Sequence, residues 1–131
     1  MENKGIVESV YESFSRGDLS SIVGLFASDI QYQMANNFPY GGGKPFVGPK
    51  AVIEGVFQRM GSEVEGMSAA PKRAIDGGDT IVVEGRYSGK IKATGKAIDA
   101  QFVHVWQLAA GKIIRFQQYT DTKGWSVATG T

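Results

Sequence analysis

The hydrophobic residues of this 131-residue chain change their spacing partway along, and that change restricts the possible folds more than any other feature. Before about residue 61 they recur mostly every three or four residues, which is typical of a buried helix face. Beyond it they mostly alternate with polar residues, which is typical of half-buried strands. A run of helices followed by a run of strands predicts an α+β fold, with helices on one face of a mainly antiparallel sheet.

The first half is predicted to hold three helices and one strand. The first helix ends at residues 16–17, and Asp18 then caps a short second helix. A strand follows over residues 29–35, and the third helix opens at Pro49, where a missing N–H costs nothing. The one long loop, residues 36–48, combines three consecutive glycines with Phe38, Tyr40 and Phe46. It is either a flap over an apolar ligand or a plug at the end of the core.

The second half is predicted to be four strands joined largely by hairpins. Their expected ranges are 63–75, 80–87, 97–108 and 112–122, and residues 76–79 form the first tight turn. We expect the tail, residues 123–131, to be small and polar apart from Trp125 and Val127. Residues 81–83 and the strand around His104 are apolar on both faces. Because helices cover only one face of such a sheet, we expect a homodimer through the outer face.

Composition narrows the class of protein. The length suits a single domain over residues 1–131. A net charge of +1 without a basic block argues against a nucleic-acid partner. No segment approaches the length of a membrane span, and the N-terminus lacks a signal peptide, so we expect a cytoplasmic protein without a membrane partner. With one histidine and no cysteine, we expect no metal site, although one built from carboxylates stays open.

His104 and Asp121 lie on the last two predicted strands, and a hairpin would place them in one sheet. A histidine and a carboxylate in an apolar pocket can do acid/base chemistry. The same two residues could equally form a buried hydrogen-bonded pair without chemistry.

Several segments together resemble the NTF2-like superfamily, in particular its SnoaL-like polyketide cyclase and ketosteroid isomerase-like branch. The segments are residues 15–18, 25–29, 39–40, 48–52, 102–106, 111–113 and 119–122. The resemblance implies an NTF2-like (cystatin-like) cone, in which a curved sheet wraps around helices and encloses an apolar pocket. It also implies dimers through the outer face of the sheet. Members include isomerases, cyclases, dehydratases, epoxide hydrolases and binding domains, so the fold alone does not give the function.

At several positions this chain differs from the catalytic residues that the ketosteroid isomerases have there. The general base of ketosteroid isomerases falls at about Met34, which cannot take a proton, and this argues against steroid isomerisation. Their helix-borne tyrosine falls near Val10, with Tyr11 one residue away, and their second acid falls near His104. The SnoaL-like cyclases instead have a strand histidine and a late aspartate. The resemblance therefore implies His104 and Asp121 as the catalytic pair.

Four residues are expected to bind substrate. Tyr32 faces inward by alternation, Tyr40 could gate the mouth, and Trp106 shares the face of His104. Gln118 faces inward if the last strand follows ketosteroid isomerase parity, whereas the cyclase analogy turns Asp121 inward, and a bulge near Tyr119 would reconcile the two. Each aromatic could also be plain core.

The sequence thus predicts a small-molecule enzyme that acts on an apolar carbonyl-containing substrate without a cofactor. The chemistry would be cyclisation, isomerisation, or hydration and dehydration. The alternative is a non-catalytic domain that binds a hydrophobic ligand in the same pocket. A third possibility, an interaction module with a filled core, would have no cavity.

Overall fold

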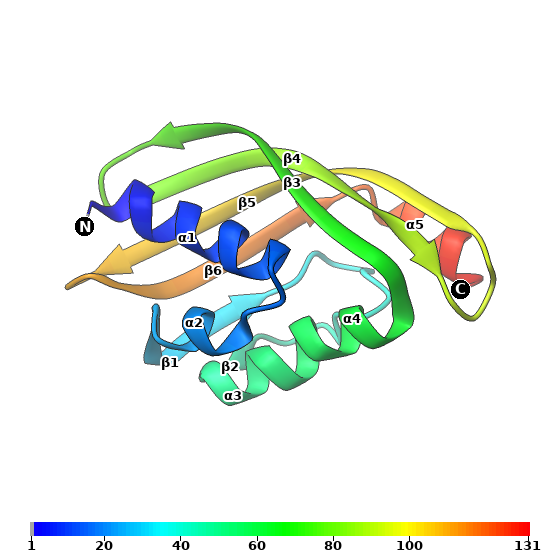
Figure 1. The fold of residues 1–131 in the computed structure, drawn as a ribbon, viewed down its shortest axis with the longest axis horizontal. Coiled ribbons are helices and arrows are strands. Elements are labelled where there is room, and N and C mark those ends of the chain that lie inside the picture. Colours follow the sequence, from blue (N-terminus) through cyan, green and yellow to red (C-terminus); the bar gives the residue numbers. More distant parts are fainter. Residues whose placement is uncertain (1) are drawn as a thin grey trace.

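The computed structural model describes residues 2–131 as a curved sheet with helices packed on its concave side (Figure 1). In chain order the elements are α1 (Asn3–Ser15), α2 (Leu19–Val23), β1 (Phe26–Gln33), β2 (Phe46–Val47), α3 (Pro49–Val52), the π-helix η1 (Ile53–Gln58), α4 (Arg59–Glu63), β3 (Val64–Asp76), β4 (Thr80–Ile91), β5 (Ala97–Ala109), β6 (Lys112–Thr120) and α5 (Thr122–Thr129). The predicted α+β class is confirmed. Within the described part of the chain, no helix is both long enough and apolar enough to cross a membrane.

The sheet has six strands in the order β2-β1-β6-β5-β4-β3. All neighbouring strands run antiparallel except β1 and β6, which pair in parallel. The last four strands follow one another as a meander, as their alternating pattern predicts. Their inner faces and the helices enclose one hydrophobic core.

The two N-terminal helices form the expected hairpin. Gly17 turns the chain with a positive φ of 70°, which suits a residue without a Cβ. The Asp18 carboxylate then accepts a hydrogen bond from the Ser21 backbone N–H at 3.2 Å and caps α2. The inward stripe of α1 buries Ile6, Val7 and Val10 against the sheet.

The third helix begins at Pro49 as predicted, but its middle turns widen into the π-helix η1. Gly55 of η1 receives the ring of Phe46 so closely that a Cβ there would lie 2.4 Å from it. The widened segment carries Val56 and Phe57 into the core. Such π-helical turns occur often at functional sites, and hydrophobic periodicity does not distinguish them from α-helix.

Two expectations for the loop and the tail need correction. The predicted loop 36–48 contains the short strand β2, which pairs with β1. The tail, for which no helix is predicted, forms α5 over residues 122–129, and its Trp125 is 0% exposed. The rings of Phe38 and Tyr40 pack edge-on against Trp125, with centroids 5.0 and 6.0 Å away. The loop aromatics therefore plug the end of the core together with α5.

Candidate functional site

His104 occupies the middle of β5 and points into the core, with only 4% of its surface exposed. Alternation along the strand places Phe102 and Trp106 on the same inner face. The Phe102 ring stacks on the imidazole with a centroid distance of 3.9 Å. Phe102 pairs with Gly85 of β4, where a Cβ would lie 2.4 Å from that ring. The absence of a side chain at Gly85 therefore gives the Phe102 ring the space it occupies beside His104.

Two tyrosine hydroxyls hold the imidazole from opposite sides. The Tyr11 hydroxyl, from α1, lies 2.6 Å from Nδ1 of His104. The Tyr87 hydroxyl, from β4, lies 2.5 Å from Nε2. Both ring nitrogens therefore have hydrogen-bond partners, and the imidazole is fixed in orientation.

Each of these hydroxyl oxygens also accepts a hydrogen bond from the N–H group of another side chain. The Trp106 indole N–H donates to the Tyr11 oxygen at 3.0 Å. The Gln118 amide donates to the Tyr87 oxygen at 2.9 Å. The backbone N–H of Ala35 donates to Gln118 Oε1 at 3.1 Å, and this assigns oxygen and nitrogen in that amide.

Burial controls the charge of this cluster. Desolvation lowers the pKa of His104 well below its ordinary value, so the imidazole is neutral near pH 7. Desolvation also raises the pKa of Tyr11, Tyr32 and Tyr87, so these hydroxyls keep their hydrogens. The site is an uncharged set of hydrogen-bonding groups within an apolar shell.

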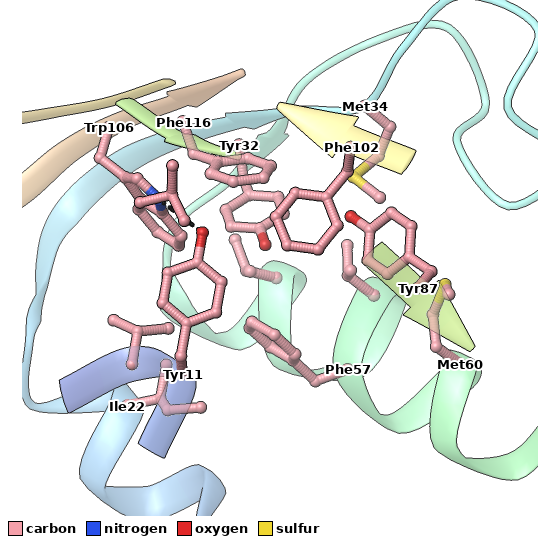
Figure 2. Close-up of a cluster of buried hydrophobic side chains, with 14 of the residues drawn as sticks. Tyr11, Ile22, Tyr32, Met34, Phe57, Met60, Tyr87, Phe102, Trp106 and Phe116 are labelled. Atoms are coloured by element: carbon pink, nitrogen blue, oxygen red, sulfur yellow. Dashed lines mark hydrogen bonds between the residues drawn. The ribbon is translucent and has the colours of Figure 1, made fainter. Parts of the chain in front are cut away.

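Tyr32, on β1, completes the polar part of the site. Its side chain is 4% exposed, and its ring stacks on Phe116 with centroids 3.9 Å apart. Within residues 2–131 its hydroxyl makes no hydrogen bond. Figure 2 shows the hydroxyl oxygens of Tyr11, Tyr32 and Tyr87 turned toward the middle of the buried cluster.

These groups line a small internal cavity of about 40 Å³. Its polar lining comes from Tyr11, Tyr32, Tyr87, His104 and Gln118, and its walls include Met34, Met60, Met67, Phe57 and Trp106. The volume holds one or two water molecules, and drug-sized ligands occupy several hundred Å³. The cavity as observed therefore fits only the polar end of a ligand.

A larger groove lies directly outside this cavity, between α1 and β3. Its volume is about 600 Å³, and its floor includes Val7, Ile81 and Val83. Tyr11 and Ala69 line both the groove and the inner cavity. These two residues are the boundary that a ligand would cross.

The structure separates Asp121 from His104, which corrects the expected catalytic pair. Strand β6 ends at Thr120, and Asp121 is exposed. Its carboxylate accepts the Gly124 backbone N–H at 3.0 Å and caps α5. The inward residues of the strand are Phe116 and Gln118, so the parity of ketosteroid isomerases holds and no bulge turns Asp121 inward.

The other expected site residues divide into two groups. The cavity is lined by Tyr32, Trp106 and Gln118. It is also lined by Met34, which lies where the general base of ketosteroid isomerases was expected. Tyr40 is buried beneath α5, and the Arg59 guanidinium lies 5.1 Å above its ring. Tyr40 does not line the inner cavity.

Tyr11 and Tyr87 are the members of the cluster that we did not expect as site residues. The helical stripe of α1 already indicated that Tyr11 faces inward. For Tyr87, alternation from Ile81 through Val83 and Gly85 would have placed it on the inner face. In residues 2–131, no three acidic, histidine or cysteine side chains lie close enough together to hold a metal ion.

Comparisons with known proteins agree with this architecture. A family model described as a SnoaL-like domain matches residues 7–116. An NTF2-like protein from Burkholderia thailandensis E264 is 32% identical, with a TM-score of 0.93 and coverage of 98% of this chain and 97% of that chain. No curated protein matches the sequence.

Two more distant structures share the fold. TerC, crystallised with polyporic acid, is 24% identical with a TM-score of 0.86, and 98% of each chain is covered. A protein named as a SnoaL-like polyketide cyclase, from Jannaschia sp. CCS1, is 14% identical with a TM-score of 0.84, covering 98% of this chain and 92% of that chain. At these identities the likeness concerns the fold.

Proposed function

We propose that this chain, which belongs to the SnoaL-like family, is a small-molecule enzyme that moves a proton on an apolar carbonyl-containing substrate without a cofactor. The observation that carries the proposal is a neutral, fully enclosed histidine held between two tyrosine hydroxyls that both line a cavity. A histidine buried only for packing also needs hydrogen-bond partners, so the functional argument is that both partner hydroxyls line a cavity. The reaction would be a cyclisation, an isomerisation, or a hydration or dehydration.

The proposed chemistry uses the cluster in place of a carboxylate. A tyrosine hydroxyl can donate a hydrogen bond to a substrate carbonyl, and this bond strengthens as negative charge develops on that oxygen. His104 can accept a proton at one nitrogen and release one at the other. In a balanced relay, Tyr11 takes a proton from the substrate carbon and gives its own hydrogen to Nδ1 of His104, Nε2 gives its hydrogen to Tyr87, and Tyr87 gives its hydrogen to the substrate oxygen. Because Asp121 is exposed and lies outside the cavity, we assign substrate contact to the tyrosines, and His104 acts through them.

The substrate would place its oxygen in the inner cavity and its apolar body in the groove beside α1. Met34, Met60 and Met67 line the cavity, and the unbranched, flexible methionine side chain adapts readily to a new shape. Movement of these side chains would enlarge the cavity without breaking the hydrogen bonds around His104. TerC, which shares this fold, was crystallised with polyporic acid, and this supports a small-molecule ligand for the present chain.

A non-catalytic binding domain is the second candidate, and one observation favours it. The cavity is lined by no carboxylate, so the strongest base within it is a neutral imidazole whose two nitrogens are both engaged. A carrier needs only apolar walls and one or two hydrogen bonds.

Hydrogen exchange with solvent separates the two candidates. We expect the protein in D₂O to speed deuterium uptake at the carbon next to the carbonyl of aryl methyl ketones and 1,3-diketones, as followed by mass spectrometry. Tyr87→Phe and His104→Gln should lower that rate about 100-fold, a typical contribution of acid/base groups. The control Tyr119→Phe removes a hydroxyl from an exposed position of β6 and should change nothing. Binding without exchange would favour the carrier, and neither binding nor exchange would contradict both candidates.

The homodimer and the cytoplasmic location stay predictions. On the outer face of the sheet, Val82 pairs with Val105, and Val103 pairs with Tyr119. The three valines are half-buried and Tyr119 is 56% exposed. This apolar face supports the proposal that a second copy covers it.

A further inference from the structure

The passage from the outer groove to the inner cavity is bounded by two side chains of very different size. Tyr11 of α1 and Ala69 of β3 line both volumes. The passage is therefore a slot with an aromatic ring on one side and a single methyl group on the other. Which groups can enter the cavity depends on how firmly each of these two walls is held.

The Tyr11 wall is fixed. Its hydroxyl lies 2.6 Å from Nδ1 of His104 and accepts the Trp106 indole N–H at 3.0 Å. Its ring lies nearly parallel to the rings of His104 and Phe102, with interplanar angles of 9° and 5°. Turning Tyr11 aside would break both hydrogen bonds in the cluster that the proposed reaction uses. A ligand must therefore pass alongside the Tyr11 ring where it stands.

The Ala69 wall is set by the pairing of β3, the edge strand that lies beside α1 (Figure 1). Ala69 pairs directly with Tyr87 of β4, so its methyl group lies on the same inner face as the Tyr87 side chain. The Cβ atoms of such a pair lie about 4.5–5.5 Å apart. A longer side chain at residue 69 would therefore extend beside Tyr87 into the slot.

The strand is irregular on both sides of this position. The pairing of β3 with β4 shifts register before residue 68 and again after residue 71, and residues 68–71 stay in register between the two shifts. Irregularities of this kind redirect side chains, and they are over-represented at sheet edges and next to active sites. Because a slip of one residue exchanges the two faces of a strand, these shifts determine that Ala69 faces the slot.

We propose that residue 69 is the specificity-determining position of the pocket, and that alanine there admits a flat ring and excludes a puckered one. A flat ring can lie parallel to the Tyr11 ring and pass the methyl group. A saturated ring carries hydrogens above and below its mean plane, and this added thickness does not fit the slot. The inference rests on the ligand pocket proposed above and adds the residue that limits the shape of the group entering it.

Two methyl ketones test this limit. Acetophenone and cyclohexyl methyl ketone have the same number of non-hydrogen atoms and the same acceptor oxygen, and they differ in whether the ring is flat. We expect the wild-type protein to bind acetophenone about tenfold more tightly, the lower end of the discrimination that one methylene group gives in an apolar pocket. Equal affinity of the wild-type protein for the two ketones would overturn the proposed limit.

Substitutions at residue 69 should move the limit in both directions. Ala69→Gly removes the methyl group and should lose most of the preference for the flat ring. Ala69→Leu fills the slot and should weaken binding of both ketones about tenfold or more. The control Ala97→Leu makes the same change at an exposed position of β5 and should bind both ketones as the wild type does. If Ala69→Leu fails to fold, the result for Ala69→Gly decides.

The ring ¹⁵N signals of His104 separate this inference from the proposed function, because His104 is the only histidine of the chain. In the free variants these signals should match the wild type, and they should shift when acetophenone binds. Shifted signals together with an unchanged preference in Ala69→Gly would overturn the role of residue 69 and leave the proposed pocket intact. Unshifted signals in the wild type at saturating acetophenone would overturn the pocket itself and this inference with it.

Discussion

Replacing Trp125 with alanine is expected to cost about 3–5 kcal/mol of folding free energy, as is typical when a large buried aromatic side chain is truncated. Trp125 is 0% exposed and is the largest apolar anchor of α5. Its ring packs edge-on against Phe38, Tyr40 and Tyr87, at centroid distances of 5.0, 6.0 and 5.5 Å. Without the indole, α5 and the loop aromatics lose the contact that joins them.

Urea unfolding measures this loss, and Trp125→Phe is the matched control. The indole N–H of Trp125 is buried without a hydrogen-bond partner in residues 2–131. Phenylalanine keeps most of the apolar contact and removes that unpaired donor, so we expect a much smaller cost. Equal unfolding midpoints for wild type and Trp125→Ala would contradict the anchoring role of α5.

Acidification is expected to destabilise the protein through His104, by about 1.4 kcal/mol for each pH unit below about 6.5. Burial lowers the pKa of the folded imidazole well below its ordinary value, so the folded state stays neutral while the unfolded chain takes up a proton. The stabilisation is fully present above the unfolded pKa and is lost as pH falls toward the folded pKa.

The single histidine makes this expectation straightforward to check, because no other histidine titrates in that window. The free energy of unfolding should fall as the pH is lowered, with the slope expected when one proton per molecule is taken up on unfolding. In His104→Gln that slope should disappear between pH 6.5 and 5.5. In the unmodified protein, the His104 ring ¹⁵N signals should stay at their neutral positions as the pH falls through the ordinary pKa of a histidine, about 6.5. Their titration near pH 6.5 in folded protein would contradict the enclosed, neutral imidazole.

The order of the elements could be predicted because it depends on local patterns. Helical stripes, the Asp18 cap and strand alternation are encoded within a few residues of each other. The helix α5 was missed because its segment is polar and short, and it gains its stability by burying one indole. The capping signal was nonetheless present, since Asp121 precedes Gly124 by three residues, but we interpreted Asp121 as catalytic.

The site was predictable only in part, because alternation assigns a residue to one face of its own strand and does not identify its partners on other elements. Alternation correctly placed Tyr32 on the inner face and Trp106 on the face of His104. For the last strand it left two alternatives, with either Gln118 or Asp121 facing inward. The partners of His104 come from α1 and β4, and contacts between elements far apart in sequence depend on packing angles that no local pattern contains. Tyr11 is 93 positions from His104, and Tyr87 is 17 away.

The most direct test of the account is a crystal structure of the protein grown with acetophenone. We expect the ketone oxygen inside the cavity, within hydrogen-bond distance of the Tyr32 hydroxyl and of the Tyr11 or Tyr87 hydroxyl. The lining methionines should have moved, and the contacts of both His104 nitrogens should be intact. A ketone bound only on the outer face of the sheet or on the surface, with the cavity unchanged, would contradict the claim that the Tyr11–His104–Tyr87 cluster is a ligand site.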